Sequence, residues 1–334
     1  MMKKQLFLSA LFPLKFTPLF LLISTLIVGG QSAWAADPFR TTNPRPIGEK
    51  TEAAFQAWFR EGNYQQAAEY LQQAEMRESQ EPLVFAMQAS LAYLKEDWQG
   101  LSNYAKKTRE AATNLQATEP LRSYLYMAVS IFLEGAVNVA QSQDIMRAAP
   151  AALNKLRTVF QYLNAANAID PNDPELNLIQ GYMDLMLATN LPFSHPNDAI
   201  QRLQDKAQPV YLVNRGIALG YRDLDQPDQA LNFALKALAE TPNNPEILYL
   251  VAQIYVIQGR RENSVDLFKK AQSYFEAALA KSSQLPKETF LQIFLEHCKN
   301  LDQIDGRNRA CRGQRENLER NLTGNWGPAT PPTL

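Results

Sequence analysis

The side chains suited to metal binding or nucleophilic catalysis are few in this chain. It has two histidines, His195 and His297, which lie about a hundred residues apart. A Ser-His-Asp relay or a two-histidine metal site requires side chains that converge in space. We therefore interpret both histidines as ordinary surface or helix residues.

The two cysteines, Cys298 and Cys311, lie 13 positions apart. In an oxidising compartment, an even pair in one short region predicts a disulfide, and the Asp-Gly turn between them would let two antiparallel helices bring the sulfur atoms together. A loop of this length stabilises a fold by about 3 kcal/mol. The alternatives are a redox-active pair or a metal site shared with His297. Three candidate ligands, two of them adjacent in sequence, make a poor zinc site.

Sequence motifs of common enzymes are missing. The chain has no Gly-rich phosphate loop, no G-x-S-x-G and no H-E-x-x-H. Paired carboxylates are plentiful, as on any helical surface, but none stands in a recognisable pocket motif. We therefore expect no enzymatic activity, no catalytic residues, no bound metal and no cofactor.

The elements that must position these residues are helices. Apolar residues recur at three- and four-residue spacing, alternation is rare, and Ala, Leu, Gln and Glu dominate. Two stretches, beginning at Tyr211 and Pro245, also align on each other at a spacing of 34 residues. The matched positions are small or aromatic: Ala218 with Ala252, Tyr221 with Tyr255, Ala230 with Ser264, and Ala237 with Ala271.

This period resembles the tetratricopeptide (TPR) repeat, whose small residues lie where two helices cross and whose helix pair ends near a proline. The resemblance implies an all-α, right-handed α-solenoid of about six helix pairs with a C-terminal helical cap, and a scaffold that binds other proteins. The expected repeats cover residues 48–278: 48–81, 82–115, 118–173, 174–208, 211–244 and 245–278.

Two of these repeats are expanded. Residues 134–149 and 189–196 are longer than the turn of a repeat requires, and we interpret them as insertions. Helices at 286–301 and 307–322 are expected to form the cap, within residues 279–322. Residues 323–334, rich in Pro, Gly and Thr, are expected to be a disordered tail.

Residues 1–35 have the pattern of a secretory signal peptide. Three lysines flank an apolar run of about 15 residues, and Ala33 and Ala35 supply small residues for cleavage after Ala35. The alternative is an uncleaved anchor, for which the run is short, because a bilayer span needs about 20 residues. The extended segment that follows, residues 36–47, is similar to the start of exported cyanobacterial TPR proteins of unassigned role. That resemblance implies a periplasmic or thylakoid-lumen address.

The exported chain is mildly acidic. Without the signal peptide, 30 basic residues stand against 34 acidic ones, which gives no electrostatic support for binding nucleic acid. Arginines gather in the cap, where acidic residues are intermixed with them, and we interpret this region as a solvated helix face. The alternative is a contact for an anionic lipid headgroup, and so for a membrane surface, or for an acidic partner. The arginines concerned are Arg307, Arg309, Arg312 and Arg315.

The first helix of each TPR pair lines the inner groove of the solenoid. The carboxylate clamp of some TPR proteins needs Lys, Arg or Asn at fixed inner positions, and here only Arg215 is suitable, so this mode is disfavoured. The groove is instead apolar and aromatic, which favours a peptide or helix laid in it. The alternative is that these residues belong to the core between repeats. The candidate partner-binding residues are Met87, Tyr93, Tyr182, Met186, Arg215, Tyr249 and Gln253.

We therefore expect an exported scaffold that binds protein or peptide partners without turnover, during assembly or maintenance of an envelope or photosynthetic membrane complex. The main alternative is a permanent accessory subunit of such a complex. A third possibility is an enzyme whose site is built by the two insertions, which lack a paired acid, base and nucleophile. The sequence names neither the partner nor an oligomeric state.

Overall fold

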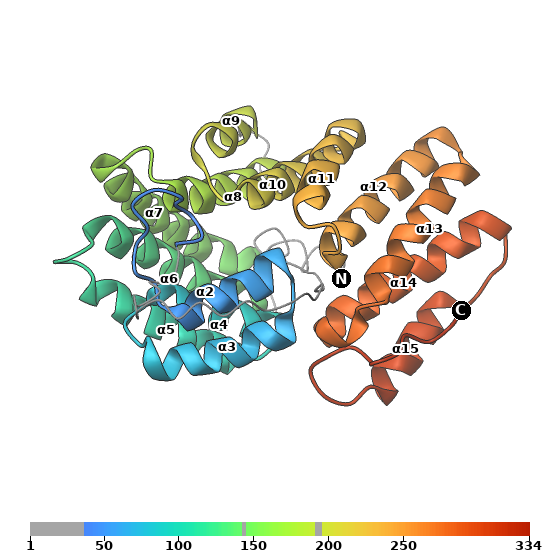
Figure 1. Ribbon diagram of the computed structural model, residues 1–334, viewed down its shortest axis with the longest axis horizontal. Helices are drawn as coiled ribbons and strands as arrows, with labels where there is room; N and C mark the ends of the chain where they lie inside the picture. The colour runs from blue at the N-terminus through green and yellow to red at the C-terminus, as the bar shows by residue number, and fades with distance from the viewer. Residues whose placement is uncertain (1–36, 142–144, 191–195) are drawn as a thin grey trace, which may run out of the picture.

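The computed structural model describes residues 37–141, 145–190 and 196–334, which form an all-α, right-handed solenoid of stacked helix pairs (Figure 1). The predicted signal peptide, His195 and most of the second expected insertion lie outside these residues. Among the helices described, none is both long and apolar enough to cross a bilayer.

The first four helix pairs form the N-terminal part of the solenoid. Its first helix, α2, continues as a π-helical turn, η1, before the chain reverses into α3. The bounds are α2 Glu49–Phe55, η1 Gln56–Arg60, α3 Tyr64–Arg77, α4 Pro82–Leu94, α5 Trp98–Asn114, α6 Pro120–Gln141, α7 Ile145–Ile169, α8 Pro174–Asn190 and α9 Pro196–Lys206.

Two regular pairs and a capping pair follow. Each expected repeat coincides with one helix pair, although α10 begins one residue before its expected range and α13 ends one residue after its own. The bounds are α10 Val210–Asp223, α11 Pro227–Glu240, α12 Pro245–Glu262, α13 Val265–Leu279, a short 3-10 turn η2 Ser282–Gln284, α14 Lys287–Asp305 and α15 Cys311–Asn321.

Most of the inner helices begin at a repeated signal. Proline stands at the first position of α4, α6, α8 and α12, and the residue before it is Glu81, Glu119, Asp173 or Asn244. Proline suits this position because it lacks the N–H that a first turn leaves unsatisfied. The side chain before it can accept a backbone N–H of that turn, as Asp173 does from Leu176 at 2.8 Å.

The alanines on which the 34-residue period depends are packed inside the solenoid. Ala218, Ala237, Ala252 and Ala271 are all 0% exposed. Side chains this small let the backbones of neighbouring helices approach closely in a core packed at crystal-like density. The prediction of small residues at the helix crossings is therefore confirmed for these two repeats.

The first expected insertion is mostly helix rather than loop. α6 runs on to Gln141 and α7 begins at Ile145, so residues 134–149 lengthen both helices of the third pair. The carboxylate of Glu134 pairs with Lys155 of α7 at 2.8 Å and also with Arg109 of α5. Interpreting this stretch as a long turn was wrong. A glycine such as Gly135 inside a helix costs only about 1 kcal/mol, which the packing of a long helix pair outweighs.

The C-terminal tail is not disordered, as its composition suggested, but packs on the solenoid. The backbone N–H of Lys287 donates to Asn325 at 2.9 Å, and that of Gly327 donates to Leu285 at 2.9 Å. The indole of Trp326 lies under the ammonium group of Lys95, 5.3 Å from its ring centre. The amino-acid composition of residues 323–334 predicted disorder wrongly, because a few backbone hydrogen bonds and one aromatic contact are sufficient to hold a short polar segment in place.

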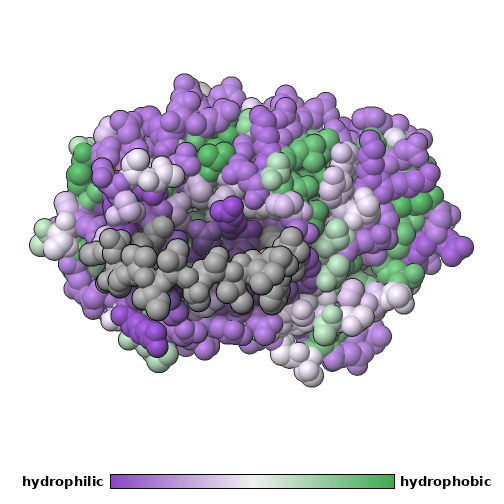
Figure 2. Space-filling model, viewed as in Figure 1, coloured by the Kyte–Doolittle hydropathy of each residue, from purple (hydrophilic) through white to green (hydrophobic). Residues whose placement is uncertain are grey.

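The two ends of the solenoid approach each other. The hydroxyl of Tyr64 on α3 donates to Glu246 on α12 at 3.0 Å, and the amide of Asn244 donates to the carbonyl of Arg60 at 3.3 Å. Figure 1 shows the last helices lying beside the N-terminal repeats. The same face is largely hydrophilic, with a few apolar patches, and is hollowed near its middle (Figure 2).

Candidate partner-binding site

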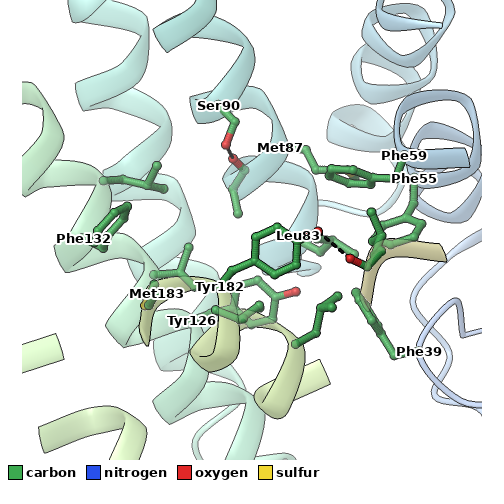
Figure 3. A pocket seen from close by; sticks show the side chains of 16 residues that line it. Phe39, Phe55, Phe59, Leu83, Met87, Ser90, Tyr126, Phe132, Tyr182 and Met183 are labelled. Carbon is green, nitrogen blue, oxygen red and sulfur yellow. Dashed lines mark hydrogen bonds between the residues drawn. The ribbon is translucent and has the colours of Figure 1, made fainter. Parts of the chain in front are cut away.

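The inner helices α4, α6 and α8 leave an apolar cavity of about 90 Å³ between themselves and the N-terminal residues (Figure 3). We call this space the groove cavity. Its lining is almost wholly apolar. The lining residues are Phe39, Phe55, Phe59, Leu83, Ala86, Met87, Ser90, Tyr126, Val129, Phe132, Leu133, Leu178, Ile179, Tyr182, Met183 and Leu212.

The three hydroxyl groups in the lining are bonded within the protein. Ser90 donates to the carbonyl of Ala86 at 2.9 Å, Tyr182 to the carbonyl of Leu212 at 2.6 Å, and Tyr126 to the carboxylate of Glu175 at 2.6 Å (the first two are drawn in Figure 3). Burial raises the pKa of Tyr182 to about 12, so its hydroxyl stays protonated at neutral pH. The cavity therefore offers mainly apolar surface, and each of its three hydroxyl groups already donates its proton inside the protein.

Aromatic rings keep the cavity from collapsing. The π-helical turn η1 follows Phe55 directly and carries Phe59, and these two rings lie 4.5 Å apart. Phe39, from the segment before α2, meets Phe55 edge-on at 5.0 Å. Rings of this size have few rotamers and pack against one another, so they form one wall while α4, α6 and α8 form the other. Such π-turns are frequent at functional sites.

A row of acidic side chains lies next to the groove cavity, at the N-terminal ends of α4, α6 and α8. It consists of Glu81, Glu119, Asp173 and Glu175, and we call it the acidic edge. Arg122 of α6, 1% exposed, donates to Glu81 at 2.6 Å and to Glu175 at 3.0 Å. Burial acts to lower the pKa of Arg122, but the charges of Glu175 and Glu81 outweigh it and raise the pKa.

The acidic edge also binds the segment that precedes α2. Arg45 donates to Asp173 at 2.6 Å and to Glu175 at 2.9 Å, and Arg40 forms a second ion pair with Asp173. Burial opposes ionisation of Asp173, yet its pKa is lowered by the hydrogen bond from the Leu176 N–H and by the charge of Arg45. The segment thus contacts the acidic edge through its arginines and the groove cavity through its phenylalanine.

Two of the seven predicted partner-binding residues meet at the groove cavity. Met87 from α4 and Tyr182 from α8 both line it. Met186, one turn further along α8, is buried outside the lining, and Arg215 is buried 3.6 Å from Glu246. A position on the inner helix therefore does not by itself place a side chain in the cavity.

The other three predicted residues contact neighbouring helices. Tyr93 meets Trp98 at a ring distance of 5.7 Å, and Tyr249 lies 6.1 Å from Phe275. The amide of Gln253 accepts from Arg222 at 2.7 Å and donates to Glu296 at 3.0 Å. The ring contacts of Tyr93 and Tyr249 lie within one helix pair, those of Gln253 join neighbouring pairs, and none of the three residues lines the groove cavity.

The predicted disulfide is present. Cys298 of α14 and Cys311 of α15 are bonded to each other, with their Cα atoms 5.7 Å apart, and Gly306 makes the turn between the helices with φ 71°. His297 is buried beside the disulfide, and its Nε2 lies 2.6 Å from the amide nitrogen of Gln272. Both cysteine sulfurs are used in the disulfide, so they are not ligands of a metal in this structure.

The arginines of the cap are mostly paired within it. Arg309 pairs with Asp302 at 2.9 Å and with Asp305 at 2.5 Å. Arg315 pairs with Glu288 and Glu319, at 2.9 and 2.8 Å. The two remaining predicted residues, Arg307 and Arg312, are exposed, although Arg307 also pairs with Asp305 at 3.5 Å. A lipid or acidic-partner contact stays a prediction, and it depends on these two arginines.

The acidic edge was missed in the sequence, although a signal for it exists. Glu81-Pro82, Glu119-Pro120 and Asp173-Pro174 all place an acidic residue before the proline that starts an inner helix. Because a solenoid stacks equivalent positions of its repeats, these side chains had to gather along one edge. The partners of that row, Arg40 and Arg45, lie in a segment outside the repeats, and no periodicity points to them.

Comparison with known proteins finds a distant structural likeness. No family model and no curated protein matches the chain. A structure of the human IFIT1 dimer with PPP-AAAA is 18% identical with a TM-score of 0.44, over 81% of this chain and 66% of that one. A second, with m7Gppp-AAAA, is 17% identical with a TM-score of 0.46, over 78% and 64%. The present chain thus spans just under two thirds of either, and a likeness this distant assigns it neither a ligand nor an activity.

Proposed function

We propose that this protein is an exported TPR-like scaffold that binds a partner protein by taking one of its apolar side chains into the groove cavity. The observation that supports the proposal is the cavity itself. It is walled by the inner helices of three successive repeats, and its own hydroxyl groups are already bonded inside the protein. An inner groove formed by successive helices is where solenoid proteins offer extended binding surfaces.

The cavity has an energetic cost that a partner would offset. Leaving about 90 Å³ of apolar space unfilled costs a fold about 2 kcal/mol. A buried leucine or phenylalanine side chain from a partner would recover this and add about 1.5–3 kcal/mol from its own burial. The flexible side chains of Met87 and Met183 let the cavity adapt to either shape.

We place this activity in the periplasm or thylakoid lumen, with a role in assembling or maintaining an envelope or photosynthetic membrane complex. The predicted signal peptide supports export, and the disulfide Cys298–Cys311 suits an oxidising compartment. Permanent residence in such a complex is the alternative. Co-purification at fixed stoichiometry from native membranes favours the resident subunit, and recovery only after cross-linking favours a transient binder.

Filling the cavity tests the binding proposal. Ala86 lines the cavity on α4 and makes no side-chain hydrogen bond, so Ala86→Leu adds three carbon atoms to the lining without removing a polar contact. We expect this variant to lose at least nine tenths of the partner captured by the wild type from its own host. Met76→Ala is the matched control, because Met76 is 76% exposed on α3 and is not among the lining residues. Equal capture by wild type and Ala86→Leu would contradict the proposal, provided that circular dichroism shows both folded.

A further inference from the structure

The segment from Asp37 to Ile47 is held on the solenoid at a few points. The described hydrogen bonds and ion pairs from it to the helices run through the side chains of Arg40 and Arg45. Phe39 and Ile47 are buried, whereas residues 41–44 between them are exposed. Discrete anchors joined by exposed residues are typical of a peptide lying in a groove, and differ from the continuous packing of a core element.

The helices orient the acidic edge without help from this segment. Glu175 accepts from both Arg122 and Tyr126, Glu81 accepts from Arg122 and from the N–H of Leu83, and Asp173 caps α8. None of these bonds involves an arginine of the segment. The acidic edge is therefore preorganised, which lowers the free-energy cost of ordering its side chains when a ligand binds.

The acidic edge carries more negative charge than the described repeats neutralise. Arg122 of α6 pairs with three of its four carboxylates, those of Glu81, Glu119 and Glu175, and among the described ion pairs Asp173 is joined only to Arg40 and Arg45. Arg40 and Arg45 add two positive charges at the most buried of these carboxylates, those of Asp173 and Glu175. Arginine suits this task, because its planar guanidinium donates to two carboxylates at once and keeps its charge when buried.

The segment is also stiff enough to act as a ligand. Three prolines, Pro38, Pro44 and Pro46, restrict its backbone before binding. The carboxylate of Asp37 also accepts from the N–H groups of Phe39 and Arg45, at 2.9 and 3.2 Å, so the segment, which was expected to be extended, is folded back on itself. A loop that is already folded in this way loses little conformational entropy when it is bound. Its side chains then present an aromatic ring directly followed by an arginine, with a second arginine five positions later.

We propose that the acidic edge and the adjoining wall of the groove cavity form one recognition site for a proline-rich loop segment of this kind, and that residues 37–47 occupy the site as an internal ligand which a partner segment displaces. The partner is thereby defined by its chemistry: an aromatic residue directly followed by arginine, and a second arginine five residues on. The inference rests on the proposed function, since it names the class of segment that the groove binds.

Binding in trans tests this proposal on the full-length exported protein. In the Arg40→Gln/Arg45→Gln variant the internal ligand keeps its length but loses both charged anchors. A labelled peptide of sequence ADPFRTTNPRPI, residues 36–47, is titrated by fluorescence anisotropy, with a control peptide in which both arginines are glutamine. We expect the arginine peptide to bind the variant at least tenfold more tightly than the control peptide does, and less tightly as salt rises. Equal, weak binding of both peptides to a folded variant would overturn the proposal.

A second measurement keeps the test valid if that variant does not fold. Both natural cysteines are in the disulfide, so Thr42→Cys places a single nitroxide label on an exposed residue of the bound segment. The arginine peptide is added above the effective concentration of a tethered ligand, which is on the order of millimolar. We expect the mobile component of the electron spin resonance spectrum to grow at least threefold, and to stay constant with the control peptide. An unchanged spectrum with both peptides would show that residues 37–47 are a fixed part of the structure, and this would overturn the proposal.

The two proposals fail separately. Loss of partner capture by Ala86→Leu together with an unchanged nitroxide spectrum would keep the scaffold function and remove the internal ligand. Peptide displacement together with normal capture by Ala86→Leu would keep the acidic edge as a peptide site and remove the cavity from the interaction.

Discussion

The inner faces of the second to fourth repeats and of the fifth and sixth repeats use the same architecture in opposite ways. On α10 and α12 small residues such as Ala218 and Ala252 are fully buried, and neighbouring side chains fill the space beside them. A Cβ atom added to Gly259 at the end of α12 would lie 2.9 Å from the ring of Phe268. On α4, α6 and α8 the inner positions are large, as at Met87 and Phe132, and they enclose empty apolar space.

This difference separates what a repeat needs for stability from what it can offer to a partner. Small residues let consecutive inner helices close on one another, which leaves nothing for a ligand to fill. Large residues hold the helices apart, and the resulting cavity costs stability that the acidic edge and its arginines help to offset. The regular repeats therefore supply the frame, and the less regular ones carry the candidate site.

The largest expected effect comes from the charges beside the cavity. Arg122→Ala leaves the buried carboxylates of Glu81 and Glu175 without their main partner, and we expect the free energy of unfolding to fall by about 3–5 kcal/mol. Its control is Arg261→Ala in the regular repeats, where an ion pair with Asp225 is 44% and 80% exposed and is worth less than about 1 kcal/mol. Urea denaturation measures both variants. Equal losses would show that the two regions do not differ as described.

Removing the disulfide should weaken the opposite end of the molecule. For Cys298→Ser/Cys311→Ser we expect a loss of about 3 kcal/mol from the stability of the cap, the figure for a loop of this length. Hydrogen exchange should locate the loss in α14 and α15 and leave α4 and α6 protected. Loss of protection around the groove cavity instead would mean that the two regions unfold as one unit.

A pair of glycine substitutions compares the filled and the hollow region directly. An added Cβ at Gly259 lies 2.9 Å from Phe268, within a filled core, so Gly259→Ala is expected to cost about 1–2 kcal/mol after its helix-propensity gain. An added Cβ at Gly216 meets Tyr182, whose ring lines the groove cavity and has space to move into. We therefore expect Gly216→Ala to be nearly neutral in thermal denaturation. A Gly216→Ala loss larger than that of Gly259→Ala would contradict this picture.

The smallest expected effect is a pH dependence on α8. Burial raises the pKa of Asp184 to about 6, although Arg202 lies 3.6 Å away and acts to lower it. The folded protein therefore binds this proton more tightly than the unfolded chain does. The resulting stability is fully present below about pH 4 and is lost as the pH rises through 6. At pH 7 we expect Asp184→Asn to be more stable than the wild type by about 1–2 kcal/mol. A variant with an unchanged slope of stability between pH 4 and 7 would show that Asp184 is not the group responsible.

Much of the fold was predictable because the geometry of a solenoid repeat depends on residues that are close together in the sequence. Ala218 and Ala252 mark helix crossings at a fixed period, and the Asp-Gly turn between Cys298 and Cys311 allowed the disulfide to be predicted from spacing. Local signals of this kind depend on a few neighbouring residues, so a single sequence contains them.

The candidate site was predicted only in part because it depends on contacts across the chain. Two of the predicted residues, Met87 and Tyr182, line the cavity. Phe39 joins them there from a segment outside the repeats, and Arg45 of the same segment pairs with the acidic edge. The pairing of Arg45 with Glu175 spans 130 residues. Neither the repeat period nor a turn motif predicts a contact between residues so far apart in the sequence.

Site-specific photo-crosslinking in an exporting host tests the central claim most directly. Benzoylphenylalanine in place of Phe132, a partly exposed residue of the cavity lining, should form a covalent adduct with the partner on irradiation. The same group in place of the exposed Met76 should form none. An adduct at position 132 alone is the result that we predict. An adduct at position 76 without one at position 132 would contradict binding in the groove cavity.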